Sequence, residues 1–529
     1  MGLWTKSLLI FKSLCDNATQ SIRQLARQTG ISKSSVHRLT QAIERRDRSP
    51  ESWWWETEDG RRWLTRLVVA ALSTFGLKRG VGLETISEFF THLHLETQVG
   101  CSPSALGGVM QALEAAILET TVAWEHDGVA PGEMREIIGA VDETFLQRRM
   151  LVFMDLVSGY LVFEEVAEDR TYDTWHTLAA ARVQLLGSGV LYLVSDRAQA
   201  LIKLAETGLG CLSIPDLFHL IHELVKSYAW AILGRLRHAR QALSHAQERL
   251  RTCEASHPRG AEAQQAQALV EARAAEVTRW EGVHSVYRQP LETRSLLVHP
   301  WHLCDSRRQT SAEVERHVHA ESRAIEVLVE TNGLPVKKKA LVKVRKQLGG
   351  LCALVDLWWQ GVWHDVQHIA LTPMWKRWVQ EVLLPLMYWQ QQAARTRCPR
   401  RKAKMLQALQ ALQAAFETHP ITPQLAPDIL SDWQAWAVER AQTFQRASSA
   451  VEGRNGYLSQ MHHNHRGLPK RRYKVWTVLH NFDCRASDGT IPASRFFRRS
   501  FPDLFETVLS QVGDLPRPRK RHQAMVRSD

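Results

Sequence analysis

The sequence predicts a mainly helical chain that contains one α/β core with a mixed sheet. Three β-rich runs follow one another along the chain, at residues 137–144, 151–155 and 159–166. A turn signal, Ser158-Gly159, separates the last two runs, which suggests a meander. A segment of helix length, 171–186, then leads to a nearly continuous apolar run at 190–196, which fits a strand buried on both faces. Long stretches outside this region have helical periodicity.

Composition indicates a globular protein with a polyanionic partner. The 529 residues leave room for two to four domains, and the formal net charge of +12 favours binding to nucleic acid. The eight cysteines form no CxxC pair, so neither a zinc ribbon nor a disulfide framework is indicated. No apolar run reaches membrane-spanning length. We therefore expect a cytoplasmic, nucleoid-associated protein without a membrane partner.

The amino-terminal region carries a two-helix pattern with a glycine turn. Residues 21–38 read SIRQLARQTGISKSSVHR, in which Ile22 and Leu25 mark an apolar face and Gly30 marks the turn. The pattern resembles the helix-turn-helix of DNA-binding proteins, whose second helix enters the major groove. This resemblance implies DNA contacts from the start of the second helix, by Ser32, Lys33, Ser34, Ser35, His37 and Arg38. The alternative is an ordinary helical hairpin with a glycine turn.

Two aspartates stand at strand positions of the α/β core. Asp142 lies inside the first β-rich run and Asp196 ends the fourth. The order β-β-β-α-β with acids at these positions resembles the ribonuclease-H-like core of DDE transposases, in which two such carboxylates lie side by side on adjacent strands. Asp155 and Glu143 are rivals. Asp155 comes just before a hairpin turn, where Asp is common, and strand alternation points Glu143 away from the face of Asp142.

Phosphodiester cleavage explains why such acids would converge. The reaction needs an activated nucleophilic oxygen and a stabilised leaving oxygen, and two Mg²⁺ ions roughly 4 Å apart supply both. Mg²⁺ takes oxygen ligands, so carboxylates from different elements must meet. The resemblance implies a two-ion site for Mg²⁺, or for Mn²⁺, that is held by Asp142, Asp196 and a third acid.

Glu452 is the candidate for the third acid, because it is the only acidic residue between Glu439 and Asp483. Its surroundings resemble the Glu-bearing helix of insertion-sequence transposases. The resemblance implies metal binding by Glu452 and a DNA-backbone contact by Arg454. The alternative is structural, since Ser449-x-x-Glu452 has the spacing of a capping box, in which the glutamate satisfies a backbone N–H.

A further motif follows the second aspartate. Asp216 and His219 are three residues apart and would share one helical face. The pair resembles the Cys/Asp-x-x-His motif of transposase groups that include the hAT and Mutator superfamilies, which implies a catalytic His219 near the scissile phosphate. Alternatively, Asp216 caps a helix at its positive end and His219 is incidental. Both interpretations can hold at once.

Three histidines near the carboxyl-terminal end also form a group: His462, His463 and His465. They suggest a metal site, but no second ligand cluster accompanies them in the sequence. We expect solvated or DNA-facing side chains.

These observations predict six segments. They are a helix-turn-helix DNA-binding domain at 1–50, a second helical DNA-binding or scaffold domain at 51–130, the first part of the core at 131–219, an all-α insertion at 220–445, the closing part of the core with the third acid at 446–510, and a basic disordered tail at 511–529. Within the insertion, Leu236, Leu243 and Leu250 recur every seven residues and predict a helical hairpin.

The resemblance implies a DNA transposase that acts on double-stranded DNA as a homo-oligomer. The amino-terminal region would recognise terminal inverted repeats, water would cleave one strand, and the freed 3′-hydroxyl would attack target DNA. Two alternatives stay open. One is a non-catalytic DNA-binding regulator or domesticated transposase, and the other is a ribonuclease-H-like nuclease without strand transfer.

Overall fold

The computed structural model divides the chain into two compact units. It describes residues 3–46, 54–55, 57–130, 132, 134–257, 260–334, 339–367, 369–464 and 470–518. The first unit comprises Met1–Gly132, Glu164–Val166 and Asn455–Asp529, and the second comprises Glu133–Phe163 and Ala167–Arg454. The six segment boundaries expected from the sequence stay predictions.

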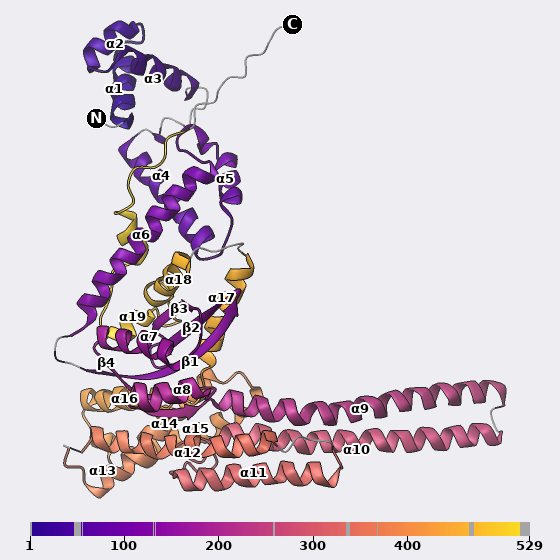
Figure 1. Cartoon of the computed structure of the whole chain (residues 1–529). Coiled ribbons are helices and arrows are strands. Elements are labelled where there is room, and N and C mark those ends of the chain that lie inside the picture. The colour runs from indigo at the N-terminus through magenta and orange to yellow at the C-terminus, as the bar shows by residue number, and fades with distance from the viewer. Residues whose placement is uncertain are drawn as a thin grey trace. The chain divides into compact units, whose positions relative to one another are not determined.

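Three short helices form the amino-terminal part of the first unit (Figure 1): α1 (Leu3–Asp16), α2 (Ile22–Thr29) and α3 (Lys33–Arg46). Ser21 and Gln24 form a capping box at the start of α2, and Gly30 ends it with a φ of 68°, in the left-handed region. The side chains between the helices form a small core of Ile10, Leu25, Ile31, Val36, Leu39 and Ile43. The helix–turn–helix arrangement expected from the sequence is present.

The rest of the first unit joins segments from both ends of the chain. Its helices are α4 (Glu58–Ala71), α5 (Leu83–His92), α6 (Pro103–Gly128), α18 (Lys470–Phe482), α19 (Pro492–Phe497) and α20 (Leu504–Leu509), with a π-helix at Leu72–Leu77 and a 3-10 helix at Leu95–Thr97. Arg472 of α18 donates to the buried carboxylate of Glu114 in α6. Trp476 Nε1 donates to Leu77 O at 2.8 Å. Contacts between the two ends of the chain therefore stabilise this unit.

Part of the expected basic tail is held in place. Gly100 N donates to Pro516 O at 2.7 Å, so the backbone near residue 516 lies against the first unit rather than extending freely. Residues 519–529 lie outside the described part of the chain.

The second unit is built on a five-stranded mixed sheet with the order β3-β2-β1-β4-β5. The strands are β1 (Arg135–Leu146), β2 (Arg148–Asp155), β3 (Leu161–Ala167), β4 (Ser188–Ser195) and β5 (Leu212–Pro215). β2 is antiparallel to β1, while β4 is parallel to β1 and β5 is parallel to β4. Helix α7 (Tyr172–Leu185) connects β3 to β4. The four strands predicted from the sequence are present, and β5 is an additional strand.

In the second unit, the segment from residue 217 to residue 442 consists mainly of helices. They are α9 (Leu217–Ser256), α10 (Ala261–Leu297), α11 (Ser311–Thr331), α12 (Lys339–Asp365), α13 (Pro373–Trp378), α14 (Leu384–Arg395), α15 (Pro399–Thr418) and α16 (Pro427–Gln442), with a π-helix at Val379–Leu383 and a 3-10 helix at Thr422–Gln424. Among the described residues of this segment, the only β-structure is an isolated bridge between Trp301 and Arg308. The segment is all-α, as the sequence predicts.

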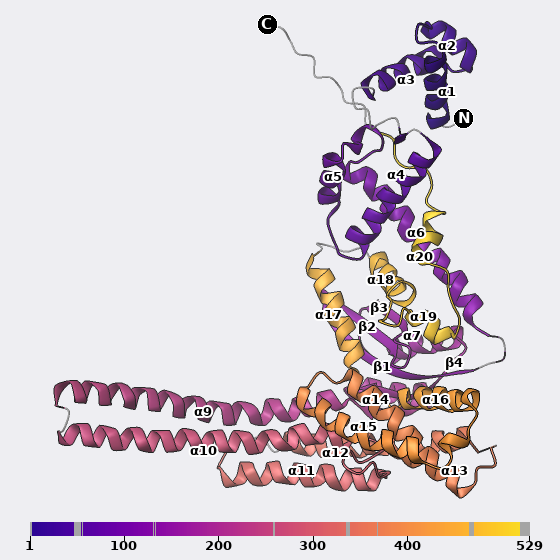
Figure 2. The same cartoon turned by 180° about the vertical axis from the view of Figure 1, so that it is seen from behind.

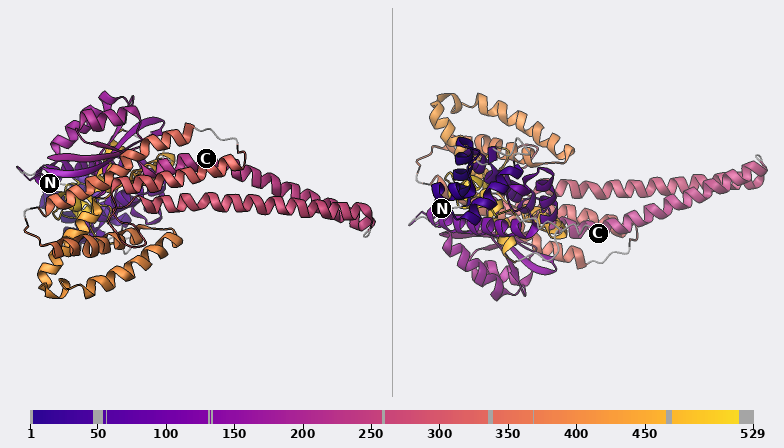
Figure 3. Two further views of the ribbon diagram at one scale, coloured as in Figure 1. Left: turned by 90° about the horizontal axis from the view of Figure 1, so that it is seen from below. Right: turned by 90° about the horizontal axis from the view of Figure 1, so that it is seen from above.

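The predicted helical hairpin is a long antiparallel pair of α9 and α10, which run side by side in every view (Figures 1, 2 and 3). Arg240 Nη2 donates to Glu281 Oε1 across the pair at 2.7 Å. Of the three leucines with seven-residue spacing, Leu236 is buried and Leu243 and Leu250 are half-buried, while Ala239 and Ala246, also seven residues apart, are buried.

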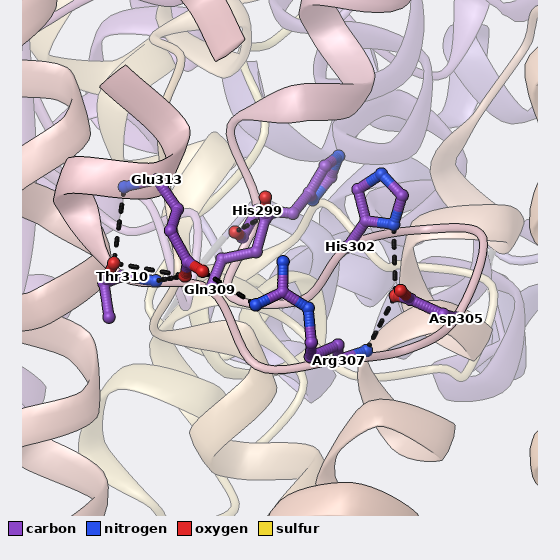
Figure 4. Close-up of polar contacts among 7 residues, drawn as sticks. All are labelled: His299, His302, Asp305, Arg307, Gln309, Thr310 and Glu313. Carbon is purple, nitrogen blue, oxygen red and sulfur yellow. Dashed lines mark hydrogen bonds and ion pairs between the residues drawn. The ribbon is translucent and has the colours of Figure 1, made fainter. Parts of the chain in front are cut away.

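A polar loop joins α10 to α11 (Figure 4). Gln309 Nε2 donates to Leu297 O at 3.2 Å and to His299 O at 3.0 Å, which closes the loop on its own backbone. Thr310 and Glu313 form a capping box at the start of α11. Arg307 Nη1 donates to the same glutamate at 2.7 Å. The loop therefore fixes the end of one helix relative to the start of the next.

None of the helices in the described part of the chain is long and apolar enough to cross a membrane.

Candidate catalytic site

Asp142 and Asp196 lie level with each other on adjacent parallel strands. In the β1–β4 pair Ala140 is opposite Val194, and two further residues along both chains reach Asp142 and Asp196. Asp196 directly follows β4, and Ala198 N donates to its Oδ1 at 2.9 Å. Neighbouring strands are about 4.8 Å apart, so this register holds the two carboxylates at one place on the sheet.

The electrostatic surroundings of Asp142 join it to three other candidates. Burial raises the pKa of Asp142 to about 6. A hydrogen bond from the Glu143 backbone and the charge of His219 oppose this rise, whereas the negative charges of Asp196 and Glu452 add to it. These four side chains come from distant parts of the sequence and lie near enough to act on one another electrostatically.

Glu452 lies in the first turn of α17 (Ser449–Asn464). Ser448 O accepts from Val451 N at 2.8 Å and from Glu452 N at 3.1 Å, so Ser448 is the residue that precedes the helix. A capping box would then pair Ser448 with Val451, so the capping-box alternative for Ser449 and Glu452 is wrong. Instead, Glu452 Oε1 lies 3.6 Å from His219 Nδ1.

Asp216 is fully enclosed and accepts four hydrogen bonds. It precedes α9, and its Oδ1 accepts from Phe218 N at 2.5 Å and from His219 N at 3.1 Å. Its Oδ2 accepts from Ser448 N at 2.6 Å and from the Ser448 hydroxyl. The helix-capping interpretation of Asp216 is confirmed, and His219 still lies beside the acids, so the two interpretations of this motif are compatible.

The surroundings of His219 favour its protonated form. Its Nδ1 is 3.7 Å from Asp216 Oδ2, which is too long for a hydrogen bond and fits an ion pair. Asp216 raises the pKa of His219 to about 9 against the effect of burial, and the charges of Glu452 and Asp142 contribute to the rise. Burial alone would raise the pKa of Asp216, but the donors on His219 and Ser448 hold it below its ordinary value. The His219 side chain is 39% exposed, so a substrate can reach it.

Two sets of residues have metal-ligand character. Asp216, His219 and Glu452 place three potential ligand atoms within 4.8 Å of one another. However, the oxygens of Asp216 already accept hydrogen bonds from backbone amides and from Ser448, which leaves them few lone pairs for a metal ion. The other set, Asp142, Asp196 and Glu452, offers carboxylate oxygens alone, a ligand type that suits Mg²⁺ or Mn²⁺, but among the described residues these oxygens do not all lie within 4.8 Å of one another.

The rival acids have structural roles. Asp155 is buried at the end of β2, where Oδ1 accepts from Ile138 N at 3.1 Å and Oδ2 accepts from Ser158 N at 2.9 Å. Its assignment as a turn residue is confirmed, and burial raises its pKa. Glu143 pairs with Arg170.

The predicted DNA-contacting residues surround the first turns of α3. Ser32, Lys33, Ser34, His37 and Arg38 are exposed and Ser35 is half-buried. Arg38 Nε donates to Ser34 O at 3.1 Å, which holds the guanidinium along the helix. Val36 faces the core instead, so the polar side chains form the outer face of this helix. Their DNA contacts stay predictions.

Two other expectations concern buried residues. Arg454 is only 7% exposed, and its DNA contact stays a prediction. His462 is buried and its Nδ1 lies 3.2 Å from Tyr473 Oη, so the expectation of a solvated or DNA-facing side chain is wrong for this residue. His463 is exposed, and His465 lies outside the described residues.

The sequence did not point to two residues that hold the site together. Tyr192 in β4 has the pattern of a core aromatic, yet its hydroxyl bonds to the backbone that leads to Glu452. Ser448 carries only the general signal of a helix cap. Their partners lie more than 200 residues away in the chain, so no local pattern reveals them.

Two family models match parts of the chain. An IclR helix-turn-helix domain matches residues 5–47, and a family of unknown function (DUF6399) matches residues 379–524. A search of curated proteins finds no match. The chain therefore carries an IclR-type helix-turn-helix DNA-binding domain at its amino-terminus, followed towards the other end by a DUF6399 domain that includes Glu452.

Proposed function

We propose that this chain is a DDE-type DNA transposase. The helix-turn-helix domain binds the transposon ends, and Asp142, Asp196 and Glu452 support metal-dependent strand cleavage and strand transfer. The observation that carries the proposal is the convergence of these three carboxylates with His219. Carboxylates that repel one another are costly to keep together, and such clusters occur where a cation or a reaction requires them.

The sheet supports the same proposal. Three neighbouring strands, of which β1 and β2 are antiparallel, are followed by a helix and a strand parallel to β1, with one acid inside β1 and the other directly after β4. This arrangement agrees with the ribonuclease-H-like core that the sequence resembles. The helix-turn-helix domain adds a means of holding DNA, which the chemistry requires.

The roles of the side chains follow from their surroundings. Two Mg²⁺ ions bound by Asp142, Asp196 and Glu452 would activate the attacking oxygen and stabilise the leaving oxygen. Asp216 keeps His219 protonated and oriented, with Nδ1 directed at the carboxylates. Nε2–H is then free of these two acids and can donate a charge-assisted hydrogen bond to a phosphate oxygen of the DNA. Because His219 carries a positive charge, it also offsets the charge that develops on that phosphate.

The experiment combines the protein with a labelled DNA fragment and a supercoiled target plasmid. The fragment carries the DNA that borders the gene for this chain, and Mg²⁺ or Mn²⁺ is supplied. A transposase nicks the fragment and joins its 3′ end to the plasmid. Nicks without joined products would indicate a nuclease instead. Binding without nicks would indicate a DNA-binding regulator.

A further inference from the structure

We infer that Asp216 and Ser448 form a clasp that positions His219 and Glu452 against each other. The two are positioning residues, and the inference rests on the proposed function of the site. It goes beyond a helix cap, because the same carboxylate holds the starts of two helices that come from opposite ends of the all-α insertion.

The need for a clasp comes from the chain's route. Glu452 follows the insertion of residues 217–442, so the chain must return to the sheet before it can present this acid. The returning segment, residues 443–448, has no helix or strand of its own to fix its path. Its position must therefore come from contacts with other elements.

Tyr192 makes the first of these contacts. Its buried hydroxyl donates to Thr443 O at 2.7 Å and accepts from Gln445 N at 2.9 Å. Tyr192 lies in β4, four residues before Asp196. The strand that carries the second acid thus fixes the start of the segment that leads to the third.

Backbone contacts continue along the segment. Leu217 N, at the start of α9, donates to Arg446 O at 3.0 Å. The Arg446 side chain donates to Val298 O at 2.7 Å, in the loop after α10. The returning segment is therefore fixed to the sheet, to α9 and to the polar loop before it reaches Ser448.

The Asp216 carboxylate makes the last contact and divides its two oxygens between two tasks. Oδ1 accepts from the first turn of α9, which carries His219. Oδ2 accepts from the backbone N–H and hydroxyl of Ser448, which precedes α17 and Glu452. Capping α9 requires Oδ1 alone, so the bonds of Oδ2 serve the second helix. One rigid side chain thereby sets both groups, and His219 Nδ1 lies 3.6 Å from Glu452 Oε1 as a result.

Asp216→Asn keeps the first task and weakens the second, and it also removes the negative charge beside His219. Asparagine caps a helix as well as aspartate does, so α9 keeps its start. Its amide nitrogen cannot accept from Ser448 N, so the backbone bond to the start of α17 is lost, and only the Ser448 hydroxyl oxygen can still accept from it. A displacement of about 1 Å can cost roughly 100-fold in rate, and we expect the nicking rate at saturating DNA to fall by about 10- to 100-fold while end binding stays unchanged.

Substitutions of Ser448 give a second test, in which one variant removes the hydroxyl and another keeps it. Ser448→Ala removes the hydroxyl and should slow nicking in the same way, whereas Ser448→Thr keeps a hydroxyl and should restore most of the rate. The Ser448 hydroxyl acts through Asp216, so Asp216→Asn combined with Ser448→Ala should cost little more than Asp216→Asn alone. Asp503→Asn is the matched control, because Asp503 caps α20 in the other unit, and it should cut at the wild-type rate.

Hydrogen–deuterium exchange of backbone amides at the start of α17 tests the clasp independently of DNA cleavage. The amides of Val451 and Glu452 bond to Ser448 O, so both clasp variants should exchange faster there, while Asp503→Asn should not. If Asp216→Asn and Ser448→Ala leave exchange and cutting unchanged, the clasp is overturned. If the wild-type protein never nicks DNA but the amides of α17 exchange faster in the two variants, the clasp is supported and the proposed function is contradicted.

Discussion

At the site, the carboxyl group of Asp142 is both partly buried and close to other negative charges. Asp142 is partly buried beside Asp196 and Glu452, which raises its pKa to about 6 from an ordinary value near 4. A metal or a phosphate-bound cation would relieve this repulsion. The metal-free protein therefore carries a cost that an uncharged side chain would remove.

Asp142→Asn should stabilise the metal-free protein at neutral pH. An acid whose pKa is raised on folding weakens the fold above that pKa, and the effect disappears below the unfolded value near 4. We expect a gain of roughly 2–3 kcal/mol at most above pH 6 and none near pH 4. Thermal unfolding in EDTA at several pH values measures this. A stabilisation of equal size at pH 4 and pH 8 would contradict the electrostatic cause.

Asp155 should behave in the opposite way. Its carboxylate accepts bonds from Ile138 and Ser158 inside the sheet, so Asp155→Ala leaves buried donors without a partner. We expect a loss of about 1–3 kcal/mol in stability. The folded variant should keep metal-dependent nicking at low temperature, where it remains native. Wild-type stability with complete loss of cutting would show instead that Asp155 is part of the catalytic set.

At the scale of elements, the sequence was informative where the pattern is local. The four expected strands begin and end within three residues of the predicted bounds, because alternating and continuous apolar runs mark them directly. The fifth strand was missed because Leu212–Pro215 has only four residues and ends in proline, which is rare inside strands. The sequence placed the capping residue of α17 at Ser449, one residue later than the structure does, since Ser448 and Ser449 give the same capping signal.

Gly139 in β1 should not tolerate a larger side chain. A Cβ at this position would lie 2.6 Å from Phe153 Cε2 and 2.7 Å from Leu193 Cδ1, on the strands to either side. Gly139→Ala should therefore destabilise the second unit by roughly 1–3 kcal/mol. Gly234→Ala is the control, because Gly234 lies in α9 with open space around it and alanine favours helix. Equal stability of the two variants in denaturant titrations would contradict the packing argument.

The second helix of the amino-terminal domain should set DNA affinity through charge. Lys33 is exposed at the start of α3. Lys33→Gln should weaken binding to the DNA that borders the gene, and should lower the slope of log affinity against log salt by about 0.9 if one phosphate contact is lost. Lys12→Gln changes an exposed lysine of α1 and serves as the control. An unchanged slope for Lys33→Gln would show that Lys33 does not contact a DNA phosphate.

At the scale of the whole molecule, the sequence could not predict which distant segments meet. The amino- and carboxyl-terminal parts form one unit through contacts such as that of Arg472 with Glu114, which lie in segments of ordinary helical pattern. The sequence also gives no signal for the hydrogen bond between Tyr192 and the segment that follows the insertion, because a tyrosine in a strand has the pattern of a core residue. The acids were predictable from their positions on elements, whereas the contacts that hold them in place depend on tertiary structure alone.

In the proposed function, Asp142, Asp196 and Glu452 act together on DNA. The most direct measurement is Mg²⁺- or Mn²⁺-dependent nicking of a DNA fragment that borders the gene, by wild type and by Asp142→Asn, Asp196→Asn and Glu452→Gln. We expect cutting by wild type and its loss in all three variants, each of which still binds the fragment. Wild-type protein that binds the fragment and never cuts it would contradict the account, as would normal cutting by any one of the three variants.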